Sequence, residues 1–295
     1  MAWKDGFIAV DWGTTNRRAY LINSDGLCAD EFEDGQGILS VPAGGFGNAV
    51  AEIRRRLGDK PLLLAGMVGS NRGWVDAPYV PAPAGLDDLA RALVWPEQGR
   101  IALVPGVSFL CDGDADVMRG EELQLLGALA AGLVSPDALV CHPGTHNKWV
   151  VLREGRIIRF RTVMTGELFN VLREHSILAD LIGGTVEGGR AFAVGVRRGL
   201  SGDCLTSELF KIRARILLGE AEASDAPSYA SGLLIGTDVR AGLGESDEQD
   251  IVVMGRPELT KLYSEAIQIA GRTPHEVNGE QAFLAGAKGI AELIE

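Results

Sequence analysis

The residues with the clearest capacity for chemistry lie in a short glycine- and threonine-rich segment, Asp11–Arg17, that follows the apolar run Phe7–Val10. A glycine lets the backbone approach a phosphate closely, and threonine hydroxyls and successive N–H groups can donate to phosphate oxygens. The candidate phosphate-binding residues are Gly13, Thr14, Thr15 and Arg17. Asp11 is a candidate to hold Mg²⁺ through bound waters, because Mg²⁺ keeps several waters and binds through one or two carboxylates. The alternative is a polar hairpin whose Asp and Thr side chains only cap turns.

A second segment, His142–Lys148, repeats this pattern at an offset of about 131 residues, which indicates an internal duplication. The offset aligns Gly13 with Gly144, Thr14 with Thr145, Asn16 with Asn147, and Arg17 with Lys148. Chance similarity between two glycine-rich hairpins is the alternative. The second copy adds Gly144, Thr145, His146 and Lys148 as candidate phosphate ligands. Because His142 stands where the first copy has Asp11, we predict that the first copy manages the metal and the transferred phosphate, and that the second clamps the remaining phosphates of ATP.

An acidic segment, Asp112–Glu122, contains candidates for the proton acceptor that phosphoryl transfer to a hydroxyl group requires. Glu121 stands at the start of a predicted helix and is the first choice for this general base, and Asp116 is the second. The run Asp-Gly-Asp-Ala-Asp also suggests a calcium loop, but its glycine spacing and terminal Glu do not fit that template. The alternative for each carboxylate is helix capping or a solvated loop.

Two further segments are suited to an acidic polyol, because an arginine can bind a carboxylate through two parallel hydrogen bonds. One is the glycine-rich loop Gly66–Trp74, and the other is Arg159–Glu167. The candidate substrate-binding residues are Ser70, Asn71, Arg72, Trp74, Arg161 and Thr162. A structural salt bridge is the alternative for each arginine. Gly255, which follows an apolar run, and the segment Gly232–Asp238 are candidates to support an adenine ring.

The elements that must position these residues are strands alternating with helices, which indicates an α/β protein. Strands are predicted at 7–10, 18–23, 61–65, 101–104, 138–141, 150–152 and 251–254. Helices are predicted at 49–57, 121–131, 166–182, 189–199, 206–218, 228–243, 257–270 and 281–295. Two copies of a strand–turn–strand motif predict two related domains, 1–125 with the first phosphate motif and the sugar-acid site, and 126–295 with the second phosphate motif and the adenosine site.

Composition narrows the class of protein. The chain has 295 residues and a net charge of -12, and an acidic surface disfavours a nucleic-acid partner. The four cysteines form no closely spaced pair, which argues against a zinc site or a disulfide framework and favours a reduced, cytoplasmic location. The longest nearly apolar stretch, Leu123–Val134, is shorter than the roughly 20 residues of a membrane span.

Five segments in this order resemble the 2-dehydro-3-deoxygalactonokinase family: DWGTTNRRAYLI, GMVGSNRGW with APYVPAPAG, DVMRGEE, PGTHNKWV and FRTVMTGELF. The resemblance runs from about residue 7 to the end of the chain and places it in the superfamily of actin-like ATPases, sugar kinases and Hsp70. It implies two ribonuclease-H-like domains facing a nucleotide cleft, and phosphorylation of the terminal hydroxyl of 2-dehydro-3-deoxy-D-galactonate in galactonate breakdown. Two positions depart from the superfamily pattern: Arg256 replaces the second glycine of the adenosine motif, and Glu121 stands where related kinases often carry Asp.

The sequence therefore predicts an ATP- and Mg²⁺-dependent kinase of a small sugar acid. The alternatives are a kinase of another sugar or sugar acid, a phosphohydrolase such as an exopolyphosphatase, and a sugar-binding regulator or filament protein on the same fold. The stereochemistry of the substrate and the oligomeric state, with a homodimer possible, stay open.

Overall fold

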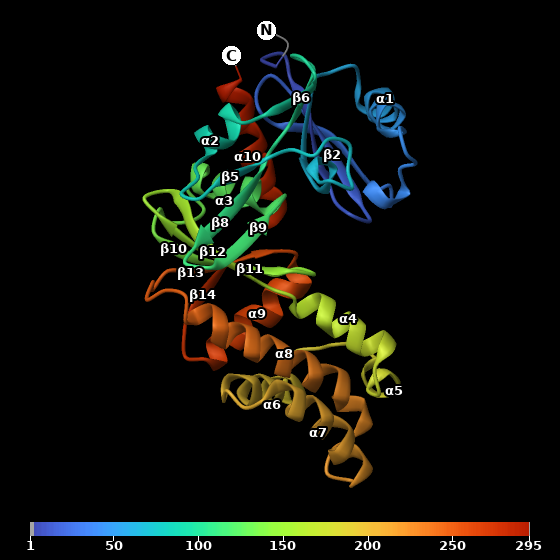
Figure 1. The fold of residues 1–295 in the computed structure, drawn as a ribbon, viewed down its shortest axis with the longest axis vertical. Helices are drawn as coiled ribbons and strands as arrows, with labels where there is room; N and C mark the ends of the chain where they lie inside the picture. Colours follow the sequence, from blue (N-terminus) through green and yellow to red (C-terminus); the bar gives the residue numbers. More distant parts are fainter. Residues whose placement is uncertain (1–2, 295) are drawn as a thin grey trace. The chain divides into compact units, whose positions relative to one another are not determined.

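The structure is a computed structural model that describes residues 3–294 and divides into two compact units (Figure 1). The first unit comprises the chain through Pro136, Glu154–Arg159 and the segment from Gly279 on, and the second comprises Asp137–Arg153 and Phe160–Asn278. The predicted boundary between residues 125 and 126 falls inside helix α3 (Glu121–Ala130), and the C-terminal helix α10 (Gly279–Leu293) belongs to the first unit. Helix α10 belongs to the first unit because it packs closely against α3, a long-range contact that composition does not reveal.

The first unit is built on a six-stranded sheet with the order β3-β2-β1-β4-β7-β6. Strands β1, β2 and β3 are antiparallel neighbours, and β4 and β7 extend the sheet in parallel with β1. The strands are β1 (Phe7–Trp12), β2 (Arg17–Ile22), β3 (Cys28–Asp34), β4 (Leu62–Gly66), β6 (Val94–Glu97) and β7 (Ile101–Leu103). Parallel strands that adjoin the first strand place the carboxyl ends of β1 and β4 at the same edge.

Helices cover both faces of this sheet. Helix α1 (Phe46–Leu57) buries Phe46, Val50, Ile53 and Leu57, a spacing of three or four residues, against the face that carries Ile8, Val10 and Trp12. Tyr20 alternates with Ala19 of that face, so it points to the opposite side, where its ring packs 5.8 Å from Phe283 of α10. Helix α3 packs on α10, as does the short helix α2 (Leu86–Arg91).

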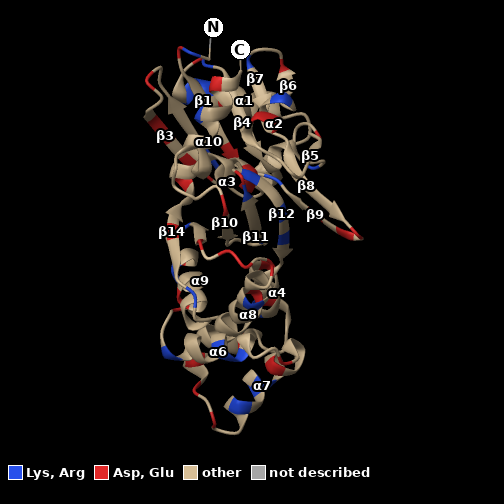
Figure 2. Ribbon diagram, turned by 90° about the vertical axis from the view of Figure 1, so that its left-hand side faces the viewer, with Lys and Arg blue, Asp and Glu red and all other residues tan. Residues whose placement is uncertain are grey.

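A small sheet of three strands completes the first unit, with β5 (Tyr79–Pro81), β8 (Gly106–Cys111) and β9 (Asp114–Met118) in the order β5-β8-β9. The acidic run that suggested a calcium loop is the turn of the β8–β9 hairpin. Asp112 and Gly113 both have positive φ, at 50° and 91°, as a two-residue hairpin turn requires. The acidic residues at the hairpin tip are visible in Figure 2.

The second unit is built on a five-stranded sheet with the order β12-β11-β10-β13-β14. Its core joins that sheet to helices α6, α8 and α9, with Trp149, Phe192 and Tyr263 among the buried side chains. The strands are β10 (Ala138–His142), β11 (Asn147–Arg153), β12 (Arg156–Val163), β13 (Ile251–Gly255) and β14 (Pro274–Asn278). The helices are α4 (Thr165–His175), α5 (Ala179–Ile182), α6 (Arg190–Leu200), α7 (Leu205–Leu217), α8 (Ala226–Leu243) and α9 (Pro257–Ile269).

The glycines of the segment Gly232–Asp238 serve helix packing rather than an adenine ring. The segment lies inside α8, and a Cβ added at Gly232 or Gly236 would lie 2.2 Å from the carbonyl oxygen of Phe192 or 2.3 Å from that of Val196, both in α6. Small residues are needed here because the two helix backbones touch. The predicted adenine role of this segment is therefore wrong.

Both units share one strand order, which agrees with the predicted duplication. In each, the first two strands form an antiparallel hairpin and a later strand, β4 or β13, lies parallel to the first. The register corrects the alignment of the second strands, because Asp11 pairs with Arg18 whereas His142 pairs with Lys148. Arg17 therefore corresponds to Asn147, and both are buried.

The predicted helix over residues 166–182 is two helices, α4 and α5. Ser176 separates them because its hydroxyl donates to the Leu172 carbonyl at 2.6 Å and accepts the Leu178 N–H at 3.0 Å. Such side-chain bonds compete with continued helix. Within the described part of the chain, no helix is long and apolar enough to cross a membrane.

Candidate active site

The first glycine- and threonine-rich segment forms the turn between β1 and β2, and a neighbouring segment holds it from behind. The carbonyls of Gly13, Thr14 and Thr15 accept the N–H groups of Ile38, Leu39 and Gly37 at 3.0–3.2 Å. A Cβ added at Gly37 would lie 2.3–2.4 Å from backbone atoms of Thr14 and Thr15, so glycine is required for this approach. With its carbonyls occupied, the exposed turn offers N–H and hydroxyl donors, which are the groups that a phosphate needs.

Asp11 stands beside this turn, where three elements of the first unit converge. It is half-buried near the end of β1. A Cβ added to Gly66, at the end of β4, would lie 3.5 Å from Asp11 Oδ1, and one added to Gly120 would lie 3.2 Å from the Gly66 Cα. Gly120 immediately precedes α3, so Glu121, the first residue of that helix, begins at the same edge. Carboxyl ends of parallel strands are where α/β proteins place ligands.

The two glutamates at the start of α3 differ in their surroundings. Glu121 is half-buried, and its Oε2 accepts the Arg119 N–H at 3.1 Å. Glu122 is fully buried, and its carboxylate accepts the Gly120 N–H at 2.7–2.8 Å. Burial raises the pKa of Glu122 to about 8, the charge of Glu121 adds to this, and the Gly120 N–H opposes it. A solvent-reachable carboxylate therefore stands next to one that is held away from solvent.

Arg17, a candidate phosphate ligand, has a structural role. Its buried guanidinium donates to both oxygens of Asp34 at 2.9 and 3.0 Å and to Glu52 at 3.0 Å. Strand alternation places it on the α1 face, over the ring of Trp12. The arginine across from Asp11 is instead Arg18, which pairs with Glu33 at 3.1 Å. Burial lowers the pKa of Arg18, but Glu33 and, more weakly, Asp11 raise it above its ordinary value.

The second turn, between β10 and β11, is held in the same way as the first. A Cβ added at Gly166, at the start of α4, would lie 2.5 Å from the Gly144 carbonyl oxygen and 2.9 Å from the Thr145 Cα. The N–H of Glu167 donates to the Thr145 carbonyl at 3.0 Å, and the Glu167 carboxylate hydrogen-bonds His146. The Lys148 ammonium is buried and donates to the His146 carbonyl at 3.2 Å. Thr145 and His146 are exposed.

Gly255 lies next to this second turn. It is the last residue of β13, and a Cβ added to it would lie 3.6 Å from the carbonyl oxygen of Pro143, the first residue of the turn. Helix α9 begins two residues later at Pro257, and a helix N-terminus favours negative charge. The second unit thus brings together the two segments that the sequence assigns to the phosphates and the adenosine.

Comparison with known proteins decides the family. The sequence model of the family described as 2-keto-3-deoxy-galactonokinase matches residues 11–290. The chain belongs to the 2-keto-3-deoxy-galactonokinase family. It is 36% identical over 292 residues to the 2-dehydro-3-deoxygalactonokinase of Escherichia coli (strain K12), with 98% of each chain covered. A Rhizobium meliloti (strain 1021) protein assigned the same activity is also 36% identical, with 98% of this chain and 97% of that one covered.

Solved structures agree with this family and with the fold. A crystal structure from Sinorhizobium meliloti, assigned as a 2-dehydro-3-deoxygalactonokinase protein, has a TM-score of 0.92 at 34% identity and covers 98% of this chain and 99% of that one. Component A of the (R)-2-hydroxyglutaryl-CoA dehydratase of Acidaminococcus fermentans has a TM-score of 0.52 at 13% identity, with 97% and 96% covered, which shows the fold alone. The predicted fold class, an α/β protein with two ribonuclease-H-like domains, is confirmed.

Arg119 contacts the segment that follows the candidate substrate loop Gly66–Trp74, and the Ala77 N–H of that segment donates to the Gly69 carbonyl of the loop at 2.9 Å. Arg119 is 9% exposed, and its guanidinium donates to the Ala77 carbonyl at 2.7 Å and lies 4.3 Å from the centre of the Tyr79 ring. Since Arg119 directly precedes Gly120, it ties the loop to the start of α3. Within the loop, Asn71 and Arg72 are exposed.

Two other residues of this loop have structural contacts of their own. The Ser70 hydroxyl donates to the Met67 carbonyl at 2.7 Å, and the Trp74 ring stacks on Phe46 at 6.1 Å between centroids. Of the four loop candidates, Asn71 and Arg72 are therefore the most available to a ligand.

The remaining candidates lie on other elements. Asp116 is on β9, where it pairs with Phe109 and accepts its own neighbour's N–H, that of Val117, at 2.7 Å. Arg161 and Thr162 lie on β12 in the second unit, and Arg161 pairs with Glu245 at 2.9 Å. The salt bridge that was the alternative for Arg161 is thus present.

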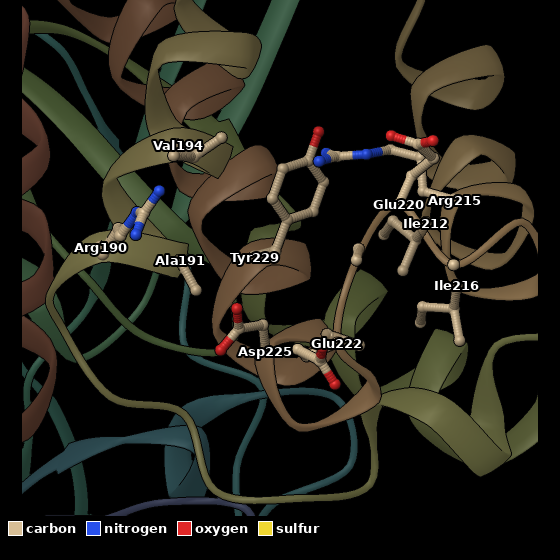
Figure 3. Close-up of a pocket in the computed structure, with 13 residues that line it drawn as sticks. Arg190, Ala191, Val194, Ile212, Arg215, Ile216, Glu220, Glu222, Asp225 and Tyr229 are labelled. Carbon is tan, nitrogen blue, oxygen red and sulfur yellow. The ribbon is translucent and has the colours of Figure 1, made fainter.

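A cavity of about 360 Å³ lies among α6, α7 and α8 of the second unit (Figure 3). Arg190, Arg215 and Tyr229 line it, with Glu222 and Asp225 opposite, and the basic residues of α6 and α7 are seen in Figure 2. It shares no lining residue with either turn, so we do not assign the transferase chemistry to it. Among residues 3–294, no three His, Cys, Asp or Glu side chains gather in a group that could hold a metal ion.

Sequence reasoning missed Gly37, Gly166 and Arg119, which position the site through contacts distant in the chain. It also chose Arg17 over Arg18. A local signal for the latter exists, because strand alternation puts Arg18 on the face of Asp11 once the turn is taken to hold four residues, 13–16.

Proposed function

We propose that the protein transfers the γ-phosphoryl group of ATP to the terminal hydroxyl of 2-dehydro-3-deoxy-D-galactonate, a step of galactonate breakdown in the cytoplasm, where ATP is available. The observation that carries the proposal is a pair of phosphate-sized turns on one repeated topology, each backed by a glycine, with a carboxylate, Asp11, near the end of the first strand where the second copy has His142. The relatives' activity supplies the substrate.

The first turn handles the transferred group. Thr14 and Thr15 donate to its oxygens, and Asp11, half-buried at a strand end, has the oxygen chemistry that hydrated Mg²⁺ prefers. Bound there, Mg²⁺ would neutralise phosphate charge as it develops. The protein itself supplies a positive charge on the same face of the sheet as Asp11, through Arg18, which lies across from Asp11 in the β1–β2 hairpin.

Glu121 is the proposed general base. Its side chain begins at the edge shared by Asp11 and Gly66, and it is half-exposed, so it can receive the proton of an attacking hydroxyl. Glu122 points into the protein and has a raised pKa, so a role in packing suits it better.

The second turn holds the remaining phosphates through Thr145 and His146, with Gly255 and the start of α9 beside it for the nucleoside. For the carboxylate of the sugar acid, Arg72 is the better candidate of the two predicted arginines. It is exposed on its loop, whereas Arg161 pairs with Glu245.

The proposal is tested by ADP release measured over a panel of substrates: the galactonate and gluconate forms of the 2-keto-3-deoxy acid, neutral hexoses and polyphosphate. We expect turnover with a sugar acid and dependence on Mg²⁺. Turnover restricted to neutral hexoses, or phosphate release from polyphosphate alone, would refute the substrate assignment. In the same assay Asp11→Asn, checked for folding, should lose activity; near-normal turnover would contradict the metal role.

A further inference from the structure

A buried carboxylate in the second unit joins four elements at one point. Asp238 of α8 is 1% exposed, and its oxygens accept hydrogen bonds from Asn147 at 2.9–3.0 Å, Trp149 at 2.7 Å, Tyr263 at 2.6 Å, and the Thr165 hydroxyl. The donors come from β11, α9 and the first residue of α4. Four donors to one buried carboxylate amount to a specific network, because a buried charge without partners is costly.

Two of these donors bracket the second turn. Asn147 directly follows His146, so its side chain fixes the point where the turn enters β11. Thr165 directly precedes Gly166, which lies against Gly144 and Thr145 from behind. Asp238 therefore holds the chain that leaves the turn and the helix start that supports the turn.

The first turn has a counterpart of this arrangement. Arg17 corresponds to Asn147, is likewise buried directly after its turn, and is held by the carboxylates Asp34 and Glu52. In both units, carboxylate groups fix the residue that directly follows the turn. The chemistry differs, since one network pairs charges and the other pairs a carboxylate with neutral donors.

We infer that Asp238 is a positioning residue for nucleotide binding, which acts through Asn147 and Thr165 to hold the second turn in its phosphate-binding shape. The inference rests on the proposed function of that turn. Asp238 itself is enclosed by protein groups and is not expected to touch the nucleotide.

The network offers a matched pair of variants. Thr165→Val and Tyr263→Phe each remove one hydroxyl donor from the same carboxylate, but only Thr165 adjoins the residue that supports the turn. Thr165→Ser restores the hydroxyl. Asp238→Asn keeps the shape of the side chain and removes the charge.

The measurement is ADP affinity by titration calorimetry, together with the KM values for ATP and the sugar acid and the melting temperature. We expect Thr165→Val and Asp238→Asn to weaken ADP binding and raise the KM for ATP, each about tenfold. A loss of this size is typical when a residue that orients a binding group is changed. The KM for the sugar acid should stay within twofold, and Thr165→Ser should recover the affinity. Tyr263→Phe should lower the melting temperature comparably but keep ADP affinity within twofold.

Unchanged ADP affinity in Thr165→Val, or equal losses in Thr165→Val and Tyr263→Phe, would overturn the inference and leave Asp238 a purely structural residue. Calorimetry with ADP does not need a phosphate acceptor. A wild-type protein that binds ADP but turns over no sugar acid would therefore count against the proposed substrate alone, and the variants would still decide the role of Asp238.

Discussion

Gly37 provides a sharp test of how the first turn is shaped, because its missing side chain is what lets 37–39 pair with 13–15. We predict that Gly37→Ala lowers kcat/KM because the added Cβ displaces the first turn. The added Cβ would lie 2.3 Å from the Thr15 carbonyl carbon and 2.4 Å from the Thr14 oxygen and the Thr15 nitrogen. All three are backbone atoms, so no side chain can rotate away to make room.

The size of the effect follows from these distances. Ordinary contact begins at 3.4 Å, so the turn and the 37–39 segment must separate by about 1 Å. A misplacement of about 1 Å at a reacting group can cost about 10²-fold in rate. The expected loss in kcat/KM is therefore about 10²-fold, with a stability loss of about 1–3 kcal/mol, as for other overpacked sites.

Gly35→Ala is the matched control, since Gly35 lies two residues away in the same loop and an added Cβ there would meet nothing within 4 Å. Both variants would be assayed for ADP release with the sugar acid and for the free energy of unfolding in urea. If Gly37→Ala kept kcat/KM within threefold of Gly35→Ala, the idea that this contact shapes the phosphate turn would be refuted.

Four further predictions follow from individual side chains. Arg72→Gln should raise the KM for the sugar acid about tenfold, through loss of a charge-assisted bond, with little change in the KM for ATP, whereas exposed Arg55→Gln should change neither. Glu121→Gln should lower kcat by about 10²–10⁴-fold at similar KM values, and near wild-type turnover would rule it out as the base. Burial raises the pKa of Glu122 from 4.5 to about 8, so the folded state keeps a proton that the unfolded state loses. The free energy of unfolding should therefore fall by a few kcal/mol as pH rises from about 5 to 8. In urea unfolding, Glu122→Gln should show a weaker dependence of this free energy on pH. A hydrogen bond with Thr206 and bonds from backbone N–H groups lower the pKa of Cys204, whereas burial raises the pKa values of Cys28 and Cys141. Limiting iodoacetamide, followed by mass spectrometry, should therefore label Cys204 before the other two cysteines. Thr206→Val should reduce this difference in labelling rate.

The sequence predicts the buried strands of this fold because each carries an uninterrupted apolar run. β1, β4, β10 and β13 are of this kind. The strand β3 is different, since Cys28–Asp34 contains four acidic residues and is largely exposed. It is an edge strand, held by its pairing with β2 rather than by burial, so a search for apolar periodicity passes over it. β14, which begins with Pro274, is missed for the same reason.

The candidate site likewise contains features with a local sequence signal and features that depend on long-range contacts. The two turns were predictable because glycine and threonine beside a strand end carry their signal locally. Gly37, Gly166 and Asp238 hold the turns through contacts between chain segments more than 20 residues apart. The residues next to them in the sequence give no sign of these contacts. The offset between Arg17 and Asn147 likewise became visible only from the hydrogen-bonded register of the two hairpins.

The duplicated turns show which parts of a phosphate site the fold fixes and which parts the sequence is free to change. Both turns keep a glycine behind them and a buried polar residue after them, because those features set the path of the backbone. The groups around that backbone differ: Asp11 and Arg18 of the first unit stand where the second has His142 and Lys148. The charged network of Arg17 with Asp34 and Glu52 stands where the second unit has Asp238 with its neutral donors. Near the end of the first strand, the first copy thus has a carboxylate and the second has an imidazole. In the proposed reaction, this difference assigns the metal and the transferred phosphoryl group to the first turn.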